Sequence, residues 1–149
     1  MAKNKGKKKC ILSKPIVKRV AIGISLGIIF GLLCSYFALK YNTTNIVNQS
    51  ALMWNLIFNR FIMGFIIAIL GLITVHPLFG FRMYPALRGA FAGGVISIDL
   101  VFGPYMMGYE NAGSIAFATI LVGAIYGMII DLVATKFAGE GEELFNSIK

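Results

Sequence analysis

The sequence predicts an all-α membrane protein, a bundle of four transmembrane helices with both termini in the cytoplasm. Of its 149 residues, 58% are hydrophobic and only 13% are charged, and the mean hydropathy is +0.80. A water-soluble domain of this length could not bury so much apolar surface. Four separate apolar runs and an uneven distribution of lysine and arginine support the same fold class.

Each apolar run is long enough to cross the hydrocarbon layer, which takes roughly 20 residues of helix. Helices are expected because lipid offers no partner to an open backbone group. The expected spans are residues 20–39, 53–75, 85–102 and 113–133. The turn residues Gly103 and Pro104 should end the third span. The rest of the chain divides into a basic tail (1–19) and a short acidic tail (136–149), on either side of a membrane domain (20–135).

The basic residues set the orientation, because lysine and arginine collect in cytoplasmic segments. Residues 1–19 hold eight of the fourteen basic residues, and the segment 76–88 and the C-terminal tail hold two each. The other two connections hold only Lys40. Four spans with both termini inside reproduce this asymmetry, whereas three or five spans do not.

The N-terminal tail points to a lipid partner. Five of its lysines should attract anionic lipid headgroups, each contributing about 1 kcal/mol near the surface; they are Lys3, Lys5, Lys7, Lys8 and Lys9. No aromatic residue interleaves with them, so a nucleic-acid partner is not expected. Cys10 and Cys34 are expected to be two reduced thiols. Asn42 and Asn48 open triplets that match the glycosylation acceptor pattern, which an ordinary solvated loop also explains.

Rows of small residues at four-residue spacing run along every expected span. Helices in lipid associate through close backbone approach, and residues four apart share a helix face, so these rows are predicted helix-packing sites. They either pack helices within one chain or partly serve a homo-oligomer. The spacing in the two halves is also in step, which suggests a duplicated two-helix hairpin. The rows are Gly23, Gly27, Gly31 and Ser35; Gly64 and Ala68; Gly89, Gly93 and Ser97; and Gly123 and Gly127.

Four polar residues inside the second and third spans form a candidate buried cluster: Asn55, Asn59, Arg60 and Asp99. An ionisable residue in hydrocarbon is costly unless it finds a partner or reaches the interface. Arg60 and Asp99 fall at comparable depth, so we expect one buried ion pair supported by the two asparagines. An ion or proton pathway, an anion site on Arg60, and snorkelling of Arg60 to the headgroups are the alternatives.

A second charged group is expected at the inner membrane boundary, where Asp131 and Arg88 lie. Asp131 is near the end of the fourth span and needs a cation to offset its burial. Its candidate partners are Arg19, Lys18, Arg82 and Arg88. We expect this group to be structural.

The motifs of enzymes are missing from the sequence. It has no His-Glu-x-x-His, no Gly-x-Ser-x-Gly, no phosphate-binding loop with lysine and no Cys-x-x-Cys. His76 is the only histidine, so neither a metal nor a cofactor is expected. The chain is therefore expected to be structural or interactive, as a homo-oligomer or a subunit of a membrane complex. The alternative is an oligomeric small channel or transporter that uses Arg60 and Asp99.

Three stretches resemble small prokaryotic and archaeal four-helix membrane proteins that have no assigned function. The resemblance implies that Asn59, Arg60, Arg88, Gly89 and Gly127 belong to a shared framework, and it implies no activity. Fluoride channels of the small dimeric type differ in the third helix, and small multidrug exporters need a glutamate in the first helix that this chain lacks. The three stretches are Asn59-Arg60-Phe61-Ile62-Met63-Gly64-Phe65, Arg88-Gly89-Ala90-Phe91-Ala92-Gly93 with Ser97, and Gly123-Ala124-Ile125-Tyr126-Gly127.

Overall fold

The structure is a computed structural model that describes residues 14–41, 49–75, 80–142 and 144. The described residues form five helices: α1 (Lys14–Tyr41), α2 (Gln49–Leu70), α3 (Pro85–Ile96), α4 (Ile98–Met106) and α5 (Ala112–Ala138). Because α3 and α4 are two halves of one span, the described chain contains four stretches long and apolar enough to cross a membrane. The all-helical fold class is therefore confirmed, and the number of candidate spans agrees with the expected four.

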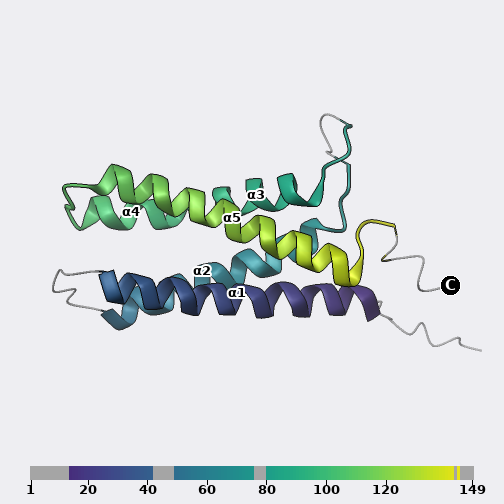
Figure 1. Cartoon of the computed structure of the whole chain (residues 1–149), viewed down its shortest axis with the longest axis horizontal. Coiled ribbons are helices and arrows are strands. Elements are labelled where there is room, and N and C mark those ends of the chain that lie inside the picture. Colours follow the sequence, from purple (N-terminus) through teal and green to yellow (C-terminus); the bar gives the residue numbers. More distant parts are fainter. Residues whose placement is uncertain (1–13, 42–48, 76–79, 143, 145–149) are drawn as a thin grey trace, which may run out of the picture.

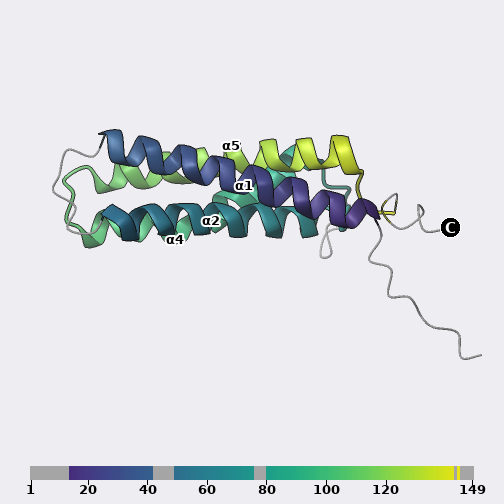
Figure 2. The ribbon, with the colours of Figure 1, turned by 90° about the horizontal axis from the view of Figure 1, so that it is seen from below.

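The helices form two antiparallel pairs that run lengthwise along the molecule (Figures 1 and 2). The first pair is α1 with α2, and the second is α5 with the broken span of α3 and α4; α1 and α2 also contact α5. We call one end of the bundle the arginine end. There α1 begins, α2 ends, α3 begins and α5 ends, and there Arg19 and Arg88 lie.

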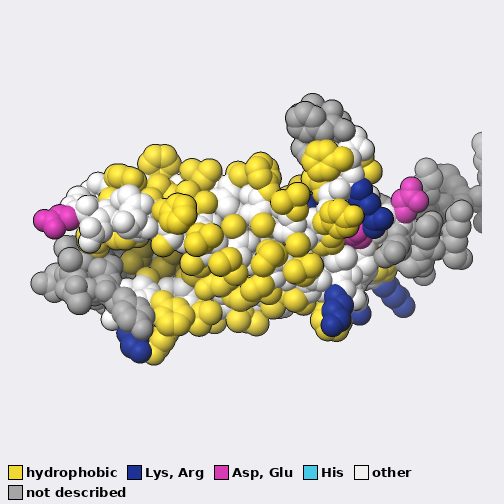
Figure 3. Space-filling view, turned by 45° about the horizontal axis from the view of Figure 1, so that its top comes forward, with side chains coloured by type: hydrophobic (Ala, Val, Ile, Leu, Met, Phe, Trp, Pro, Cys, Tyr) yellow, Lys and Arg dark blue, Asp and Glu magenta, His cyan; other side chains and the backbone are white. Residues whose placement is uncertain are grey.

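The surface is apolar along its length and charged at its ends. Figure 3 shows hydrophobic side chains covering the middle of one face, while Lys, Arg, Asp and Glu side chains gather toward the two ends. Large hydrophobic residues point outward from every helix; Phe58, Phe91 and Phe117 are examples. Such an apolar surface is typical of a protein with helices that cross a membrane.

Glycines bring the two helices of the first pair into backbone contact. A Cβ atom on Gly23 would lie 2.5 Å from the carbonyl oxygen of Gly64, and one on Gly31 would lie 2.8 Å from the Cα atom of Ile57. No ordinary side chain tolerates such distances, so a larger residue would force the helices apart. The α1 glycines at this interface are Gly23, Gly27 and Gly31.

The second pair is built in the same way. A Cβ atom on Gly93 would lie 2.9 Å from the Cα atom of Gly127, and one on Gly127 would lie 2.8 Å from the Cα atom of Gly93. Gly89 approaches the backbone of Gly127, and Gly123 approaches Ser97. Both glycine interfaces therefore lie between helices of one chain.

The helix ends differ from the expected spans. α1 begins at Lys14, which places Arg19 inside a helix, and α2 ends at Leu70 instead of continuing to residue 75. The predicted end of the third span at Gly103 and Pro104 is wrong, because α4 continues through both to Met106. Proline lacks the backbone N–H group, but the next residues still find acceptors. Met107 N donates to the carbonyl of Gly103 at 3.0 Å, for example.

Several sequence-based expectations lie outside the described residues. They concern Lys3, Lys5, Lys7, Lys8 and Lys9 of the N-terminal tail, Cys10, Asn42 and Asn48 of the glycosylation triplets, and His76. Cys34 is described and carries a free thiol.

Candidate functional site

The third span is interrupted at Ser97, between α3 and α4. The backbone N–H of Leu100 donates to the carbonyl of Ser97, three residues back, at 3.2 Å. An uninterrupted α-helix would pair it with the carbonyl of Ile96, four residues back. The carbonyl of Ile96 accepts instead from the side-chain amide of Asn59, at 3.1 Å. A polar side chain of α2 thus satisfies the backbone group that the interruption releases.

Four side chains meet at this interruption, and we call them the Ser97 cluster: Asn59, Arg60, Ser97 and Asp99. Asn59 Nδ2 also donates to Asp99 Oδ1 at 2.8 Å. Arg60 Nη1 donates to Asn59 Oδ1 at 3.1 Å and to Ser97 Oγ at 2.6 Å. The side chain of Asn59 therefore links the guanidinium of Arg60 to the carboxylate of Asp99. The hydrogen bonds of the cluster connect α2 with the point where α3 and α4 meet.

Arg60 is deeply buried, with 2% of its surface exposed. Its guanidinium carbon lies 5.7 Å from the ring centroid of Tyr126, which stacks on Phe30 at 4.3 Å. Such a contact attracts a cation to the ring face. Among the described residues, no hydrogen-bond partner reaches the Nε atom of Arg60. Since Arg60 is buried, it does not snorkel to the headgroups.

The predicted ion pair between Arg60 and Asp99 is not formed. In the described parts of the chain, the ion pairs within 4 Å involve other residues. Counting residues along each span gave the two side chains comparable depth, but depth does not fix the direction in which a side chain points. Asp99 faces an open cleft, whereas Arg60 faces the core, and Asn59 lies between them.

The cleft lies between the two helix pairs at the end opposite the arginine end, which we call the cleft end. Its volume is about 540 Å³, and Figure 3 shows the surface hollowed at this end. Asn55 and Asp99 line it and are exposed, so the expectation that these two side chains are buried is wrong. The other polar side chains in the lining are Tyr109, Asn111 and Thr119, and the apolar ones include Leu52, Leu56, Leu100, Met107 and Ile115.

Among the described residues that line the cleft, only Asp99 is charged. It lies in the first turn of α4, where the positive end of the helix dipole interacts favourably with a carboxylate. One carboxylate oxygen accepts from Asn59. Within the described chain no donor reaches the other oxygen, which leaves it available to a solute in the cleft.

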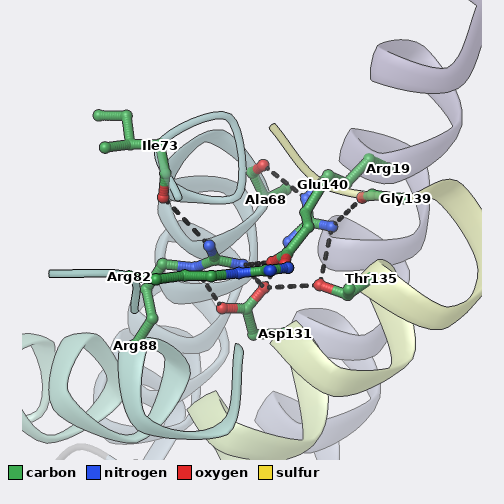
Figure 4. Close-up of polar contacts among 9 residues, drawn as sticks. All are labelled: Arg19, Ala68, Ile73, Arg82, Arg88, Asp131, Thr135, Gly139 and Glu140. Atoms are coloured by element: carbon green, nitrogen blue, oxygen red, sulfur yellow. Dashed lines mark hydrogen bonds and ion pairs between the residues drawn. The ribbon is translucent and has the colours of Figure 1, made fainter. Parts of the chain in front are cut away.

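The arginine end carries a second polar group, which we call the arginine network: Arg19, Arg88, Asp131, Thr135 and Glu140 (Figure 4). Arg19 pairs with Asp131 through Nη2. Its Nη1 atom donates to the hydroxyl of Thr135 at 3.0 Å and to the carbonyl of Gly139 at 2.5 Å. Its Nε atom donates to the carbonyl of Ala68 at 3.1 Å, on α2. One guanidinium thereby joins α1 to α2 and α5.

Arg88 completes the network from α3. Its guanidinium makes a bidentate contact with Asp131, with Nε 2.7 Å from Oδ2 and Nη2 3.0 Å from Oδ1. The same Nη2 atom donates to Glu140 at 3.1 Å, and Nη1 donates to the carbonyl of Ile73 at 3.1 Å. Two-point arginine–carboxylate contacts are strong and directional. Asp131 therefore receives two cations, one from each helix pair.

Because the arginine network is buried, the loss of any one of its charges is costly. Asp131 is 0% exposed, and Arg19 and Arg88 are almost as deeply buried. Removing one partner of such a group leaves an uncompensated charge and costs about 3–5 kcal/mol. The network thus joins all the helix ends at this end of the bundle, with its charges matched.

The sequence indicated part of the network. Asp131 was expected to pair with one of four cations, and the structure brings it together with two of them, Arg19 and Arg88. Thr135 and Glu140 were missed. The overlooked signal was glycine on both sides of Glu140, because Gly139 and Gly141 have φ values of 83° and 56°. Glycine adopts these angles readily, and they turn the chain back over the end of the bundle.

No protein-family model, curated protein or solved structure matches the chain. The functional argument therefore rests on the two polar groups and the cleft.

Proposed function

We propose that the chain is a small membrane carrier whose two helix pairs rock against each other around the Ser97 cluster. One observation carries the proposal: the two ends of the bundle are in opposite states. The arginine network holds the pairs together at one end, and a cleft of about 540 Å³ separates them at the other. Alternating access needs a binding site that is open on one side and closed on the other.

The position of the Ser97 cluster supports a carrier. Transporters commonly build their sites near the middle of the membrane from interrupted helices, whose freed backbone groups bind the solute. Here the interruption at Ser97 lies beside the cleft, and Asp99 connects it to the cleft lining. The cleft volume also falls within the ~300–1,000 Å³ of small-molecule sites.

The arginine network is suited to be the closed gate. The contacts of Arg19 with Asp131, Thr135 and Gly139 cross from the first helix pair to the second. Opening this end requires these contacts to break together. In the proposed orientation, with both termini in the cytoplasm, the network faces the cytoplasm and the cleft faces outward.

A purely structural role as a homo-oligomer has less support. The glycine rows of α1, α3 and α5 are used between helices of the same chain. They are therefore not free to form a close interface with a second copy or another membrane protein. The carrier proposal instead uses the two features that packing alone leaves unexplained, which are the interrupted span and the exposed carboxylate.

Cysteine labelling tests the movement without knowledge of the solute. The full chain, with Cys10 and Cys34 replaced by serine, is placed in lipid nanodiscs that expose both faces to a water-soluble maleimide. Asn111→Cys reports on the cleft, and Ala134→Cys reports on the arginine end, where Ala134 is 0% exposed. Labelling should be fast at the first reporter and slow at the second.

Glu140→Gln should reverse this pattern in part, because it removes the charge that pairs with Arg88 and Arg82. We expect the Ala134→Cys reporter to label several-fold faster and the Asn111→Cys reporter to label more slowly. The matched control is Glu142→Gln, which changes an exposed carboxylate two residues later and should alter neither rate. If both reporters accelerate together, or neither responds to Glu140→Gln, the protein does not alternate and the proposal is wrong.

A further inference from the structure

We infer that the cleft binds a small organic ammonium ion, with the positive charge at Asp99 and an apolar substituent against the leucines of the cleft wall. This inference rests on the proposed carrier function and names the class of solute that the carrier would take.

The sign of the charge comes from Asp99. It is the charged side chain among the described residues that line the cleft. Arg60 does not cancel it by direct pairing, since the guanidinium is buried beyond Asn59 and bonds to Asn59 and Ser97. A cation that enters the cleft thus meets the carboxylate first, while an anion meets only amides and hydroxyls.

The geometry of the carboxylate leaves room for one donor. Oδ1 accepts from Asn59 at 2.8 Å, and Asp99 is exposed on its cleft side. An ammonium group placed there would bond to the second oxygen, and Asn55, whose side-chain amide also offers an acceptor, lines the same cleft. Charge-assisted bonds of this kind are roughly twice as strong as neutral ones.

The rest of the lining favours an organic cation over a metal ion. Hard metal ions take six or more oxygen ligands, and the described residues contain no group of three or more His, Cys, Asp or Glu side chains that could hold a metal. The wall beside Asp99 is instead largely apolar, with Leu52, Leu56, Leu100 and Ile115. Such a wall gains free energy by covering a hydrocarbon substituent.

The linkage through Asn59 suggests how binding could promote movement. Its amide joins Asp99 to Arg60 and also bonds to the carbonyl of Ile96. An ammonium ion at the second oxygen of Asp99 offsets the negative charge of the carboxylate and so weakens the charge-assisted hydrogen bond from Asn59 to Oδ1. Weaker attachment of Asn59 would loosen α2 from the interrupted span, which lies in the other helix pair.

Phenethylammonium is a suitable probe, with phenylacetate as its anionic analogue of similar shape. Binding of each to the detergent-solubilised full chain is measured by isothermal titration calorimetry. We expect saturable binding of the amine and none of the acid. Asp99→Asn should weaken amine binding by roughly 10- to 100-fold, because a hydrogen bond to a charged group is lost.

Glu110→Gln is the matched control, because it removes an exposed carboxylate at the same end that does not line the cleft. It should leave amine binding unchanged, and the thermal unfolding of Asp99→Asn should show that this variant is folded. Equal binding of amine and acid, undiminished binding by Asp99→Asn, or no saturable amine binding would each overturn the inference. The labelling experiment needs no amine, so alternation without amine binding refutes the solute class alone, and binding without alternation refutes the carrier alone.

Discussion

The two ends of the bundle use the same kinds of residue in opposite ways. At the arginine end, Asp131 accepts from two guanidinium groups and is 0% exposed. At the cleft end, Asp99 accepts from one neutral amide and is exposed. The cation nearest to it in the cluster, Arg60, is held by Asn59, Ser97 and an aromatic ring instead.

This difference distinguishes a structural charge from a functional one. A buried charge that is fully paired fixes the register of the helices that carry it, and little remains for a ligand to gain. An exposed carboxylate inside a candidate membrane span contributes little to folding, and its presence there is a reason to assign it a function. The comparison predicts that equivalent substitutions at the two ends will have unequal effects.

The largest contrast is expected between Asp131→Asn and Asp99→Asn, which make the same chemical change. Asp131→Asn leaves Arg19 and Arg88 buried with too little negative charge, and should lower the free energy of unfolding by about 3–5 kcal/mol. Asp99→Asn should change it by no more than about 1 kcal/mol, because the side chain is exposed. Unfolding in mild detergent, followed by circular dichroism, measures both. Equal losses would show that both carboxylates are structural.

A smaller contrast is expected between two glycines, one at each end. A Cβ atom on Gly71 would overlap with the guanidinium of Arg19, whereas one on Gly103 would have no atom of the described part of the chain within 4 Å. Arg19 cannot move aside without breaking its bonds to α2 and α5. Gly71→Ala should therefore cost about 1–3 kcal/mol of stability through overpacking.

Gly103→Ala is the matched control and should be neutral or stabilising by up to about 1 kcal/mol, because alanine favours a helix more than glycine does. The same unfolding measurement applies. A neutral Gly71→Ala would mean that the network rearranges freely, which would weaken its assignment as a gate that opens as one unit.

Hydropathy and residue spacing were sufficient to predict the helical class and the number of spans. Both depend on properties summed over twenty or so residues, and such sums tolerate local irregularity. The helix ends were less predictable. The continuation of α4 past Pro104 depends on acceptors that later residues find, and the early end of α2 at Leu70 coincides with the close contact between Gly71 and Arg19.

The interruption at Ser97 could not be predicted from the sequence around it. Ile96, Ser97 and Ile98 are compatible with a continuous apolar helix, and no glycine or proline occurs there. The partners that stabilise the interruption, Asn59 and Arg60, are contributed by another helix. Local patterns do not contain such tertiary contacts, which is also why the direction of Asp99 was assigned incorrectly.

The smallest effect is expected within the arginine end itself, where Glu140 accepts from two arginines. Arg88 reaches it from the buried network at 3.1 Å, whereas Arg82 reaches it at 3.3 Å with a side chain that is 72% exposed. Exposed ion pairs contribute roughly 0–1 kcal/mol and weaken as salt is added. Arg82→Ala should therefore lower stability by less than about 1 kcal/mol, and the loss should vanish at high ionic strength.

Unfolding at low and high salt separates this pair from the network beneath it. Arg88→Ala is the comparison, and its larger loss should persist at high salt because screening by mobile ions hardly reaches a buried pair. If Arg82→Ala lowered the free energy of unfolding as much as Arg88→Ala at both salt concentrations, the exposed Arg82 would belong to the arginine network as fully as the buried Arg88 does. Glu140 would then be anchored from both sides, and its substitution would be a poor way to open the arginine end.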